Sequence, residues 1–389
     1  MRAGGAFTAG VVALVALAGC SSDPGSAATP TATAVTTTAS ASPTVEAAVA
    51  ELRWADGTPV EGPTIDVADA TDVRLGQEVT VTTELSAAEG WRPHVVDLQA
   101  DGTYLAVDLR GDASPGGGPD GYGPLRLVTG DGVRTLRSPA PSDTDVFDTG
   151  SLAAFVDGGV AWVERSSGGA EWRVLHATDG KAEGRVVAEG DASSDVDVRA
   201  LGPAAAYDDA GGTLRWDGER VPRSTTGTVR VTPSGADILV STCTEDGCEI
   251  DVEGPDGSSS AFVRTSVEAY VLAADERHVV LYLSSDDDGD GQVWVLDRIA
   301  RTALQMVGAS GIDLDVDDGR VLLTTDPGVV DGLHDLLLID LATQRVERLL
   351  VDRVTAGLSL AGDLVAWTTS APVGGDGVGG AILSWPRAG

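Results

Sequence analysis

A strand pattern that recurs about every 43 residues constrains this chain more than any other feature. Each unit starts with a strand and a tight turn, often containing Asp-Gly, and continues with a strongly apolar strand and a loop. A third strand then ends near an aspartate, and a polar strand completes the unit. The pattern runs from His94 to the end of the chain at residue 389. Four strands at this period are typical of a propeller blade, so we predict an all-β fold, a β-propeller of about seven four-stranded antiparallel blades, with six or eight as alternatives.

The last unit ends at Trp385 without an outer strand, which leaves a sheet edge that must be covered. Residues 49–93 precede the repeats and contain "EVTVTTEL" at 78–85, an alternating pattern that predicts a strand. We expect this strand to close the ring and the propeller proper to span residues 94–389.

Tryptophan recurs on the third strand of several units. These residues are Trp172, Trp216, Trp294 and Trp385. Packing between blades explains an aromatic residue at a repeated position most simply, and a shared ligand surface is the alternative.

The first 19 residues have the pattern of a secretory signal peptide. Arg2 precedes an apolar run from Ala6 to Ala18 that is shorter than the roughly 20 residues needed to cross a bilayer. The run ends in Leu17-Ala18-Gly19-Cys20, which resembles the bacterial lipobox. The resemblance implies that Cys20 is lipidated and becomes the new N-terminus. The alternative is an ordinary signal peptide with a chance cysteine.

Residues 20–48 are rich in Ser, Thr, Ala and Pro with almost no charge, which predicts a disordered tether behind the lipidated cysteine. A lipid anchor would hold the folded part at the extracytoplasmic face of the cytoplasmic membrane without crossing it. The chain has 26 Lys and Arg against 60 Asp and Glu, a net charge of −34, which argues against nucleic acid as a partner. Its arginine-rich usage, with Lys181 as the only lysine, is typical of an actinobacterial protein, and we expect a monomer.

Two further cysteines, Cys243 and Cys248, flank the segment "TEDG" between two alternating strands. They would face each other across a hairpin, and an extracytoplasmic location favours a disulfide. A redox-active pair is the alternative, but the spacing is not the Cys-x-x-Cys of thioredoxin-like redox motifs.

The stretch "VVLYLSSDDDGDGQVWVLDR", residues 279–298, resembles the repeats of TolB-like and related WD40-like propellers. In those repeats a strand ends in Ser-Asp, a loop rich in Asp, Gly and Asn follows, and the next strand ends in an apolar residue and Asp. Here these elements are Ser285-Asp286, residues 287–291 and Leu296-Asp297. The resemblance implies a fold rather than an activity.

The same loop suggests a calcium site. Asp286, Asp288 and Asp290 occupy positions 1, 3 and 5 of a calcium-loop pattern, and Asp297 falls at position 12. The flanking segments are strands, however, and Trp294 takes a position where a ligand is expected. We therefore predict a solvated turn, with a weak calcium site as the alternative and no other cofactor.

Catalytic motifs are missing from the sequence. The four histidines, His94, His176, His278 and His334, fall in different units, and neither His-Glu-x-x-His nor Gly-x-Ser-x-Gly occurs. A propeller-linked peptidase would also need a hydrolase domain of some 200 residues or more.

The sequence thus favours a non-catalytic binding or scaffolding protein of the cell envelope, whose partner is a protein, a glycan or a small ligand. The alternative is a propeller enzyme, a lyase or hydrolase, with its active site at the channel mouth. A calcium-dependent adhesion role is the third option. Clustered His, Arg and Asp at the channel mouth would favour the enzyme, and a broad apolar face would favour the binder.

Overall fold

The computed structural model describes residues 51–85, 91–110, 122–137, 147–166, 171–178, 184–191, 198–202, 205–208, 212–216, 220–222, 228–284, 291–309, 313–325, 333–352, 354–369 and 380–387. Nearly all regular structure in these ranges is β-strand, with one 3-10 turn, η1 (Val67–Asp69).

The described strands form seven sheets that we number as blades in chain order. Blade 1 is β5 (Trp91–Leu98), β6 (Tyr104–Arg110), β7 (Tyr122–Thr129) and β8 (Gly132–Arg137); blade 2 is β9 (Phe147–Val156), β10 (Gly159–Ser166), β11 (Glu171–Thr178) and β12 (Arg185–Asp191); blade 3 is β13 (Val198–Leu201), β14 (Ala205–Asp208), β15 (Gly212–Arg215) and β16 (Arg220–Pro222). Blade 4 contains β17 (Thr228–Ser234), β18 (Asp237–Thr244), β19 (Gly247–Glu253) and β20 (Ser259–Thr265); blade 5 contains β21 (Ala269–Ala274), β22 (His278–Leu283), β23 (Gln292–Asp297) and β24 (Thr302–Val307); blade 6 contains β25 (Leu314–Asp317), β26 (Arg320–Thr325), β27 (Leu333–Asp340) and β28 (Arg345–Asp352); blade 7 contains β29 (Val354–Ala361), β30 (Leu364–Thr369) and β31 (Gly380–Ser384).

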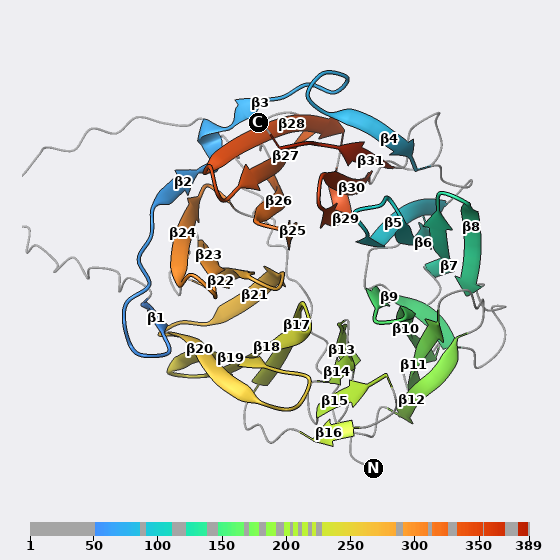
Figure 1. Ribbon diagram of the computed structural model, residues 1–389, viewed down its shortest axis with the longest axis horizontal. Helices are drawn as coiled ribbons and strands as arrows, with labels where there is room; N and C mark the ends of the chain where they lie inside the picture. Colours follow the sequence, from blue (N-terminus) through green and yellow to red (C-terminus); the bar gives the residue numbers. More distant parts are fainter. Residues whose placement is uncertain are drawn as a thin grey trace, which may run out of the picture. The chain divides into compact units, whose positions relative to one another are not determined.

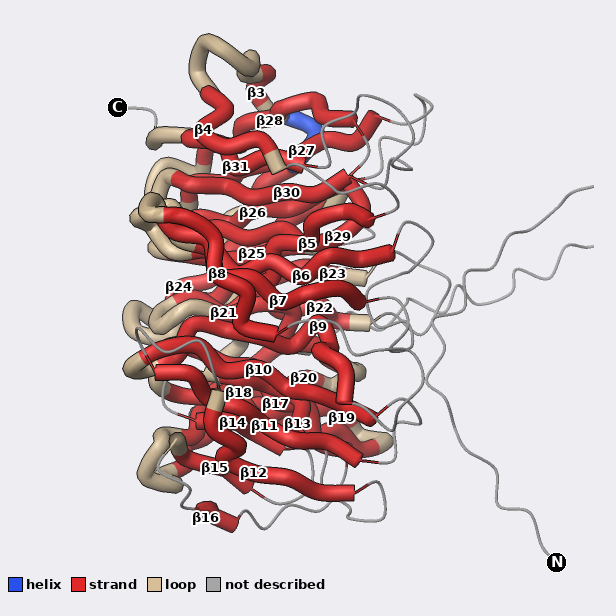
Figure 2. Tube along the Cα trace, turned by 90° about the vertical axis from the view of Figure 1, so that its right-hand side faces the viewer, coloured by secondary structure: helices blue, strands red, loops and turns tan. Residues whose placement is uncertain are grey.

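The blades follow one another around a ring, with the first strand of each blade innermost (Figure 1). Seen from the edge, most of the described loops lie along one side of the ring (Figure 2). The described tight turns that join first to second strands in blades 1 and 4 to 6 contribute residues to one cavity, which places them on a common side. We call this side the short-turn face. The predicted all-β propeller is confirmed.

The hydrophobic core lies between neighbouring blades rather than inside any one of them. One cluster joins blades 4 and 5 through Leu239, Ile250 and Leu281, each with no exposed surface, and five similar clusters join other neighbouring pairs. This is why the second strands are continuously apolar, because a blade inside the ring is covered on both faces. Each buried aliphatic side chain contributes about 1.5–3 kcal/mol, so the interfaces between blades dominate stability.

Residues 51–85 form a strap along the outside of blades 4 to 7, and it makes four strands where the sequence predicted one. β1 (Leu52–Trp54) pairs with β20 in antiparallel orientation, whereas β2 (Thr64–Asp66) and β3 (Thr71–Asp72) pair in parallel with β24 and β28. Blades 4, 5 and 6 therefore have five strands rather than the four that the repeat predicted. β4 (Thr80–Glu84) pairs with β31 and forms the outer strand of blade 7.

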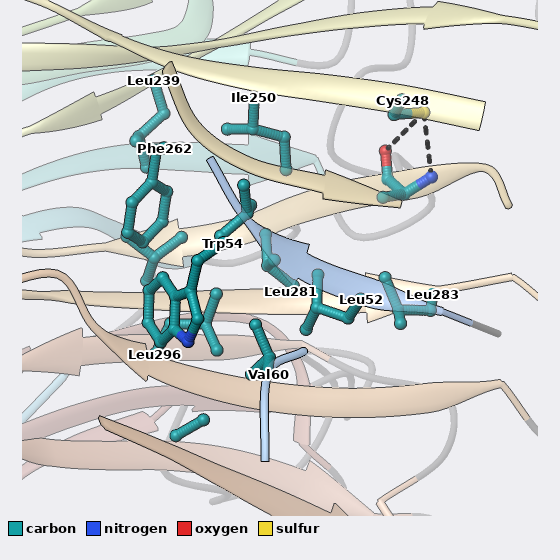
Figure 3. Packing of buried hydrophobic residues seen from close by; sticks show 14 residues of the cluster. Leu52, Trp54, Val60, Leu239, Cys248, Ile250, Phe262, Leu281, Leu283 and Leu296 are labelled. Atoms are coloured by element: carbon teal, nitrogen blue, oxygen red, sulfur yellow. Dashed lines mark hydrogen bonds between the residues drawn. The ribbon is translucent and has the colours of Figure 1, made fainter. Parts of the chain in front are cut away.

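Contacts along its length hold the strap in place. Trp54 packs edge-on against Phe262 within the core that joins blades 4 and 5 (Figure 3). Arg348 on β28 forms an ion pair with Asp72 on β3 at 2.7 Å. At Gly62 the strap lies so close to blade 5 that a Cβ atom would be 1.9 Å from the Ala303 carbonyl oxygen, so only glycine fits there.

The recurrent tryptophans pack between blades, as predicted. Trp172, Trp216 and Trp385 are buried in inter-blade clusters, and Trp294 packs partly buried against another. The expectation that they occupy one repeated position on the third strand was wrong. Trp172 is near the start of β11, whereas Trp216 and Trp385 directly follow β15 and β31.

Within the described ranges no helix has the length and apolar character needed to cross a membrane.

Candidate functional site

A cavity of about 1400 Å³ opens at the short-turn face, where the channel of the ring ends. Its wall includes residues from the inner hairpins of all seven blades. It also extends outward between blades 5 and 6 to Pro63 of the strap. We call the whole cavity the mouth groove, with an inner part at the channel and an outer part between these two blades.

Two aspartates of the inner part lie near the ends of their inner strands. Asp97 on β5 is opposite Leu105, one ladder pair before the last pair, and Asp315 on β25 is opposite Leu322, two pairs before the last pair. Their blades flank blade 7, where Ser359 on β29 is also two pairs before the last pair. Three neighbouring inner strands thus place Asp315, Ser359 and Asp97 on one side of the channel wall, and all three line the cavity.

Each of these carboxylates links its blade to the next one. Asp97 Oδ2 accepts a hydrogen bond from the backbone N–H of Phe155 on β9 at 2.7 Å, and Asp315 Oδ2 accepts one from Leu360 on β29 at 2.8 Å. The other carboxylate oxygen of each accepts the N–H of the following residue, Leu98 or Val316. An acid inside an apolar strand therefore satisfies backbone donors that the inner strands leave unpaired.

The surroundings of the inner wall disfavour the charged form of its aspartate side chains. Burial raises the pKa of Asp97 to about 6, although two backbone N–H groups act in the opposite direction. Burial raises the pKa of Asp315 to about 7, and the charges of Asp97 and Asp317 add to this effect. The pKa of Asp317 is raised mainly by burial as well. Carboxylates shifted in this way are stabilised in their charged form by any cation that approaches them.

A His–Asp pair lies at the edge of the inner part. His278 Nδ1 is 3.1 Å from Asp275 Oδ2, and the backbone N–H groups of Arg277 and His278 donate to Asp275 Oδ1. Burial raises the pKa of Asp275, but its hydrogen bonds with His278 and with the backbone outweigh this and lower it. Asp275 thus holds the tight turn between β21 and β22 and orients the imidazole.

Two arginines of the chain already bind acids of the mouth groove. Arg277 donates to Asp297 at 2.7 Å, and Asp297 also accepts the N–H groups of Ile299 and Ala300. Arg387, after the last strand, donates to the backbone oxygen and to Oδ2 of Asp318 at 2.5 and 2.7 Å. None of the ion pairs found among the described residues involves Asp97, Asp315 or Asp317.

The outer part of the groove is mainly apolar. Ile299, in the turn between β23 and β24, has 72% of its surface exposed, the largest fraction of any bulky apolar residue in the described ranges. Leu304, Leu341 and Ala342 line the same part, and Pro63 ends it at the strap. A single exposed apolar side chain is common on protein surfaces, and Ile299 is a candidate contact because it lines the groove together with other apolar residues.

The structure brings together only some of the residues singled out in the sequence. Cys243 and Cys248 form the predicted disulfide, and Cys248 Sγ accepts the Ala269 N–H of the next blade at 3.2 Å (Figure 3). His94, His176 and His278 lie in blades 1, 2 and 5, and His334 lies on β27 of blade 6.

Two predicted sites fall outside the described residues. These are the lipidation site at Cys20 and the calcium loop with Asp286, Asp288 and Asp290. Asp297, at position 12 of the loop pattern, binds Arg277 and a turn at the short-turn face, at the far end of β23 from the loop. Within the described ranges no group of three or more His, Cys, Asp or Glu could hold a metal ion.

The inner aspartates were missed in the sequence, although a signal for them exists. Asp97 and Asp315 each interrupt an apolar inner strand shortly before a tight turn, in "HVVDLQADG" and "LDVDDG". An acid in such a strand indicates a buried acceptor or a channel wall.

Solved structures with a similar arrangement of strands include the propeller domain of a protease, a peptidase and the protein AztD. The propeller domain of the Trilobed protease from Pyrococcus furiosus is 11% identical with a TM-score of 0.47, over 71% of this chain and 91% of that one. An acylaminoacyl peptidase is 11% identical with a TM-score of 0.46, over 71% of this chain and 49% of the peptidase. AztD from Citrobacter koseri is 12% identical with a TM-score of 0.37, over 71% of this chain and 80% of AztD.

These similarities are distant, and the propeller architecture rests on the sheets themselves. No protein-family model matches the chain, and no curated protein matches it either.

Proposed function

We propose that this chain is a lipid-anchored binding protein at the extracytoplasmic face of the membrane, and that the mouth groove is its ligand site. The observation that carries the proposal is the cavity of about 1400 Å³, which has a polar inner part and an apolar outer part. Ligand sites in proteins are concave, mostly apolar, and contain a few polar groups that orient the ligand. The partner would be an envelope protein, a glycan or a small ligand.

The lipid anchor is tested by Cys20→Ala. Without the thiol no diacylglyceryl group can be attached, so we expect the variant to be released from the membrane or to remain unprocessed. Membrane fractionation followed by immunoblotting measures both outcomes. A variant that is still matured and membrane-bound would show that the lipobox interpretation is wrong.

The ligand site is tested by photo-crosslinking on intact cells. A benzophenone amino acid at position 299 should give an adduct of defined mass, because Ile299 lines the groove and is 72% exposed. The matched control is the same amino acid at position 133, since Val133 is 64% exposed on β8 and lies outside the groove. Equal labelling at both positions, or labelling at 133 alone, would contradict the proposal.

An enzyme remains the second candidate, because the mouth groove contains a His–Asp pair. His278, oriented by Asp275, has the arrangement of a general base, and Asp315 faces the same cavity as an acid. This is the clustering of His, Arg and Asp that would favour an enzyme. We rank binding first because Asp275 and Asp297 both also bind backbone N–H groups of tight turns, and Arg277 is paired with Asp297.

A calcium ion at Asp286, Asp288 and Asp290 stays a minor proposal. Three carboxylates without a bidentate fourth acid would give a site in the range of about 10⁻⁴–10⁻³ M, like other weak extracellular sites.

A further inference from the structure

The shape of the mouth groove limits what it can hold. It runs from the inner strands of blades 5 and 6 past β23 and β24 to Pro63 of the strap. Crossing four strand spacings of about 4.8 Å gives a length of roughly 15–20 Å. This is the span of about five or six residues of extended chain. A compact ligand would fill only one end of such a groove.

The two ends of the groove differ in chemistry. Asp97, Asp315 and Asp317 at the channel end have backbone N–H partners and no ion pair among the described contacts. At the strap end Ile299 is exposed, and Leu341 and Ala342 line the same part of the groove. The groove is thus acidic at one end and apolar at the other.

One arginine of the chain already lies at the rim of the acidic end, where its partner Asp318 directly follows Asp317 in the sequence. Arg387 reaches the mouth from the last residues and binds Asp318 through both its backbone and its side-chain oxygen, while 42% of the Arg387 side chain stays exposed. The rim of the acidic end therefore accommodates a guanidinium group, and fork-like donors suit carboxylates better than a point charge does.

We propose that the mouth groove binds an extended peptide segment with a basic residue in the channel mouth and an apolar residue over Ile299. The inference rests on the proposed function and specifies its ligand. A peptide matches the length of the groove and can carry both chemical characters along one chain. The basic residue would neutralise Asp315 and Asp317, and the apolar residue would cover the isoleucine.

Hexapeptide pools test the proposal with the mature full-length chain in detergent. One position is fixed as Arg, Gln or Glu and the other positions are randomised. We expect the Arg pool to bind at least tenfold more tightly than the Gln pool, and its bound fraction to be enriched in apolar residues four or five positions away. The double variant Asp315→Asn, Asp317→Asn should lose this preference. The control variant Asp246→Asn should keep it, because Asp246 is in an exposed hairpin turn at the end of β18 away from the mouth groove.

A second variant is predicted to bind more tightly, a result that misfolding cannot explain. Arg387→Ala removes a competing guanidinium from the mouth, so we expect it to bind the Arg pool several-fold more tightly. Equal binding of the three pools would overturn the proposal. Tight binding of spermidine or calcium, together with a bound Arg pool that is not enriched in apolar residues, would overturn it as well. If position 299 is labelled on cells but the pools bind equally, the peptide proposal fails and the ligand site stands.

Discussion

Arg320→Leu is expected to lower the free energy of unfolding by about 2–5 kcal/mol, because two carbonyl acceptors lose their donor at a cost of about 1–3 kcal/mol each. Arg320 on β26 is 1% exposed and donates to the Trp385 carbonyl oxygen at 2.6 Å. It also donates to the Gly362 carbonyl oxygen at 2.7 Å and to Asp363 at 3.2 Å. A leucine would leave these acceptors without their donor at the interface between blades 6 and 7.

Urea denaturation followed by tryptophan fluorescence measures this loss. The matched control is Arg264→Leu, because Arg264 is 59% exposed and pairs with Glu249 on the neighbouring strand. An exposed pair contributes at most about 1 kcal/mol. Losses of similar size in the two variants would contradict the role assigned to Arg320.

The second large effect is a dependence of stability on pH. The pKa values of Asp97 and Asp315 in the folded protein, about 6 and about 7, lie above the usual value of an aspartate. The folded state therefore binds more protons than the unfolded state between about pH 4 and pH 7. The free energy of unfolding should fall as the pH rises through this range, by on the order of 2 kcal/mol for each carboxyl.

The double variant Asp97→Asn, Asp315→Asn isolates this contribution. It should be less stable at pH 5, because an amide nitrogen cannot accept the backbone N–H groups that the carboxylates bind. Its free energy of unfolding should nevertheless change less between pH 5 and pH 8 than that of the natural chain. Parallel pH profiles from thermal denaturation would show that these two groups do not titrate in this range.

The blade architecture could be predicted from the sequence because each repeat unit contains the complete strand and turn pattern of one blade. Strands such as His278–Leu283 are apolar on both faces, and this can be read without knowing which strand lies next to them. The Cys243–Cys248 disulfide was predictable for the same reason, since a hairpin brings these residues together whatever the rest of the chain does.

The strap shows where this reasoning fails. Thr64–Asp66 and Thr71–Asp72 are two or three residues long, too short for a periodic signal, and they pair with strands more than 200 residues away. The mouth groove is likewise formed by residues that are far apart in the sequence. Asp97 and Asp315 look like isolated acids in the sequence, and only closure of the ring places them on one wall with Ser359 between them.

The most direct test of the account is whether the acidic inner part of the mouth groove holds the partner that contacts its apolar outer part. The measurement is the yield of the position-299 photo-adduct on intact cells, compared between the natural chain and the Asp315→Asn, Asp317→Asn variant at equal surface abundance. We predict that the adduct is lost or reduced at least tenfold in the double variant and retained in Asp246→Asn. An adduct of unchanged yield in the double variant would contradict the account.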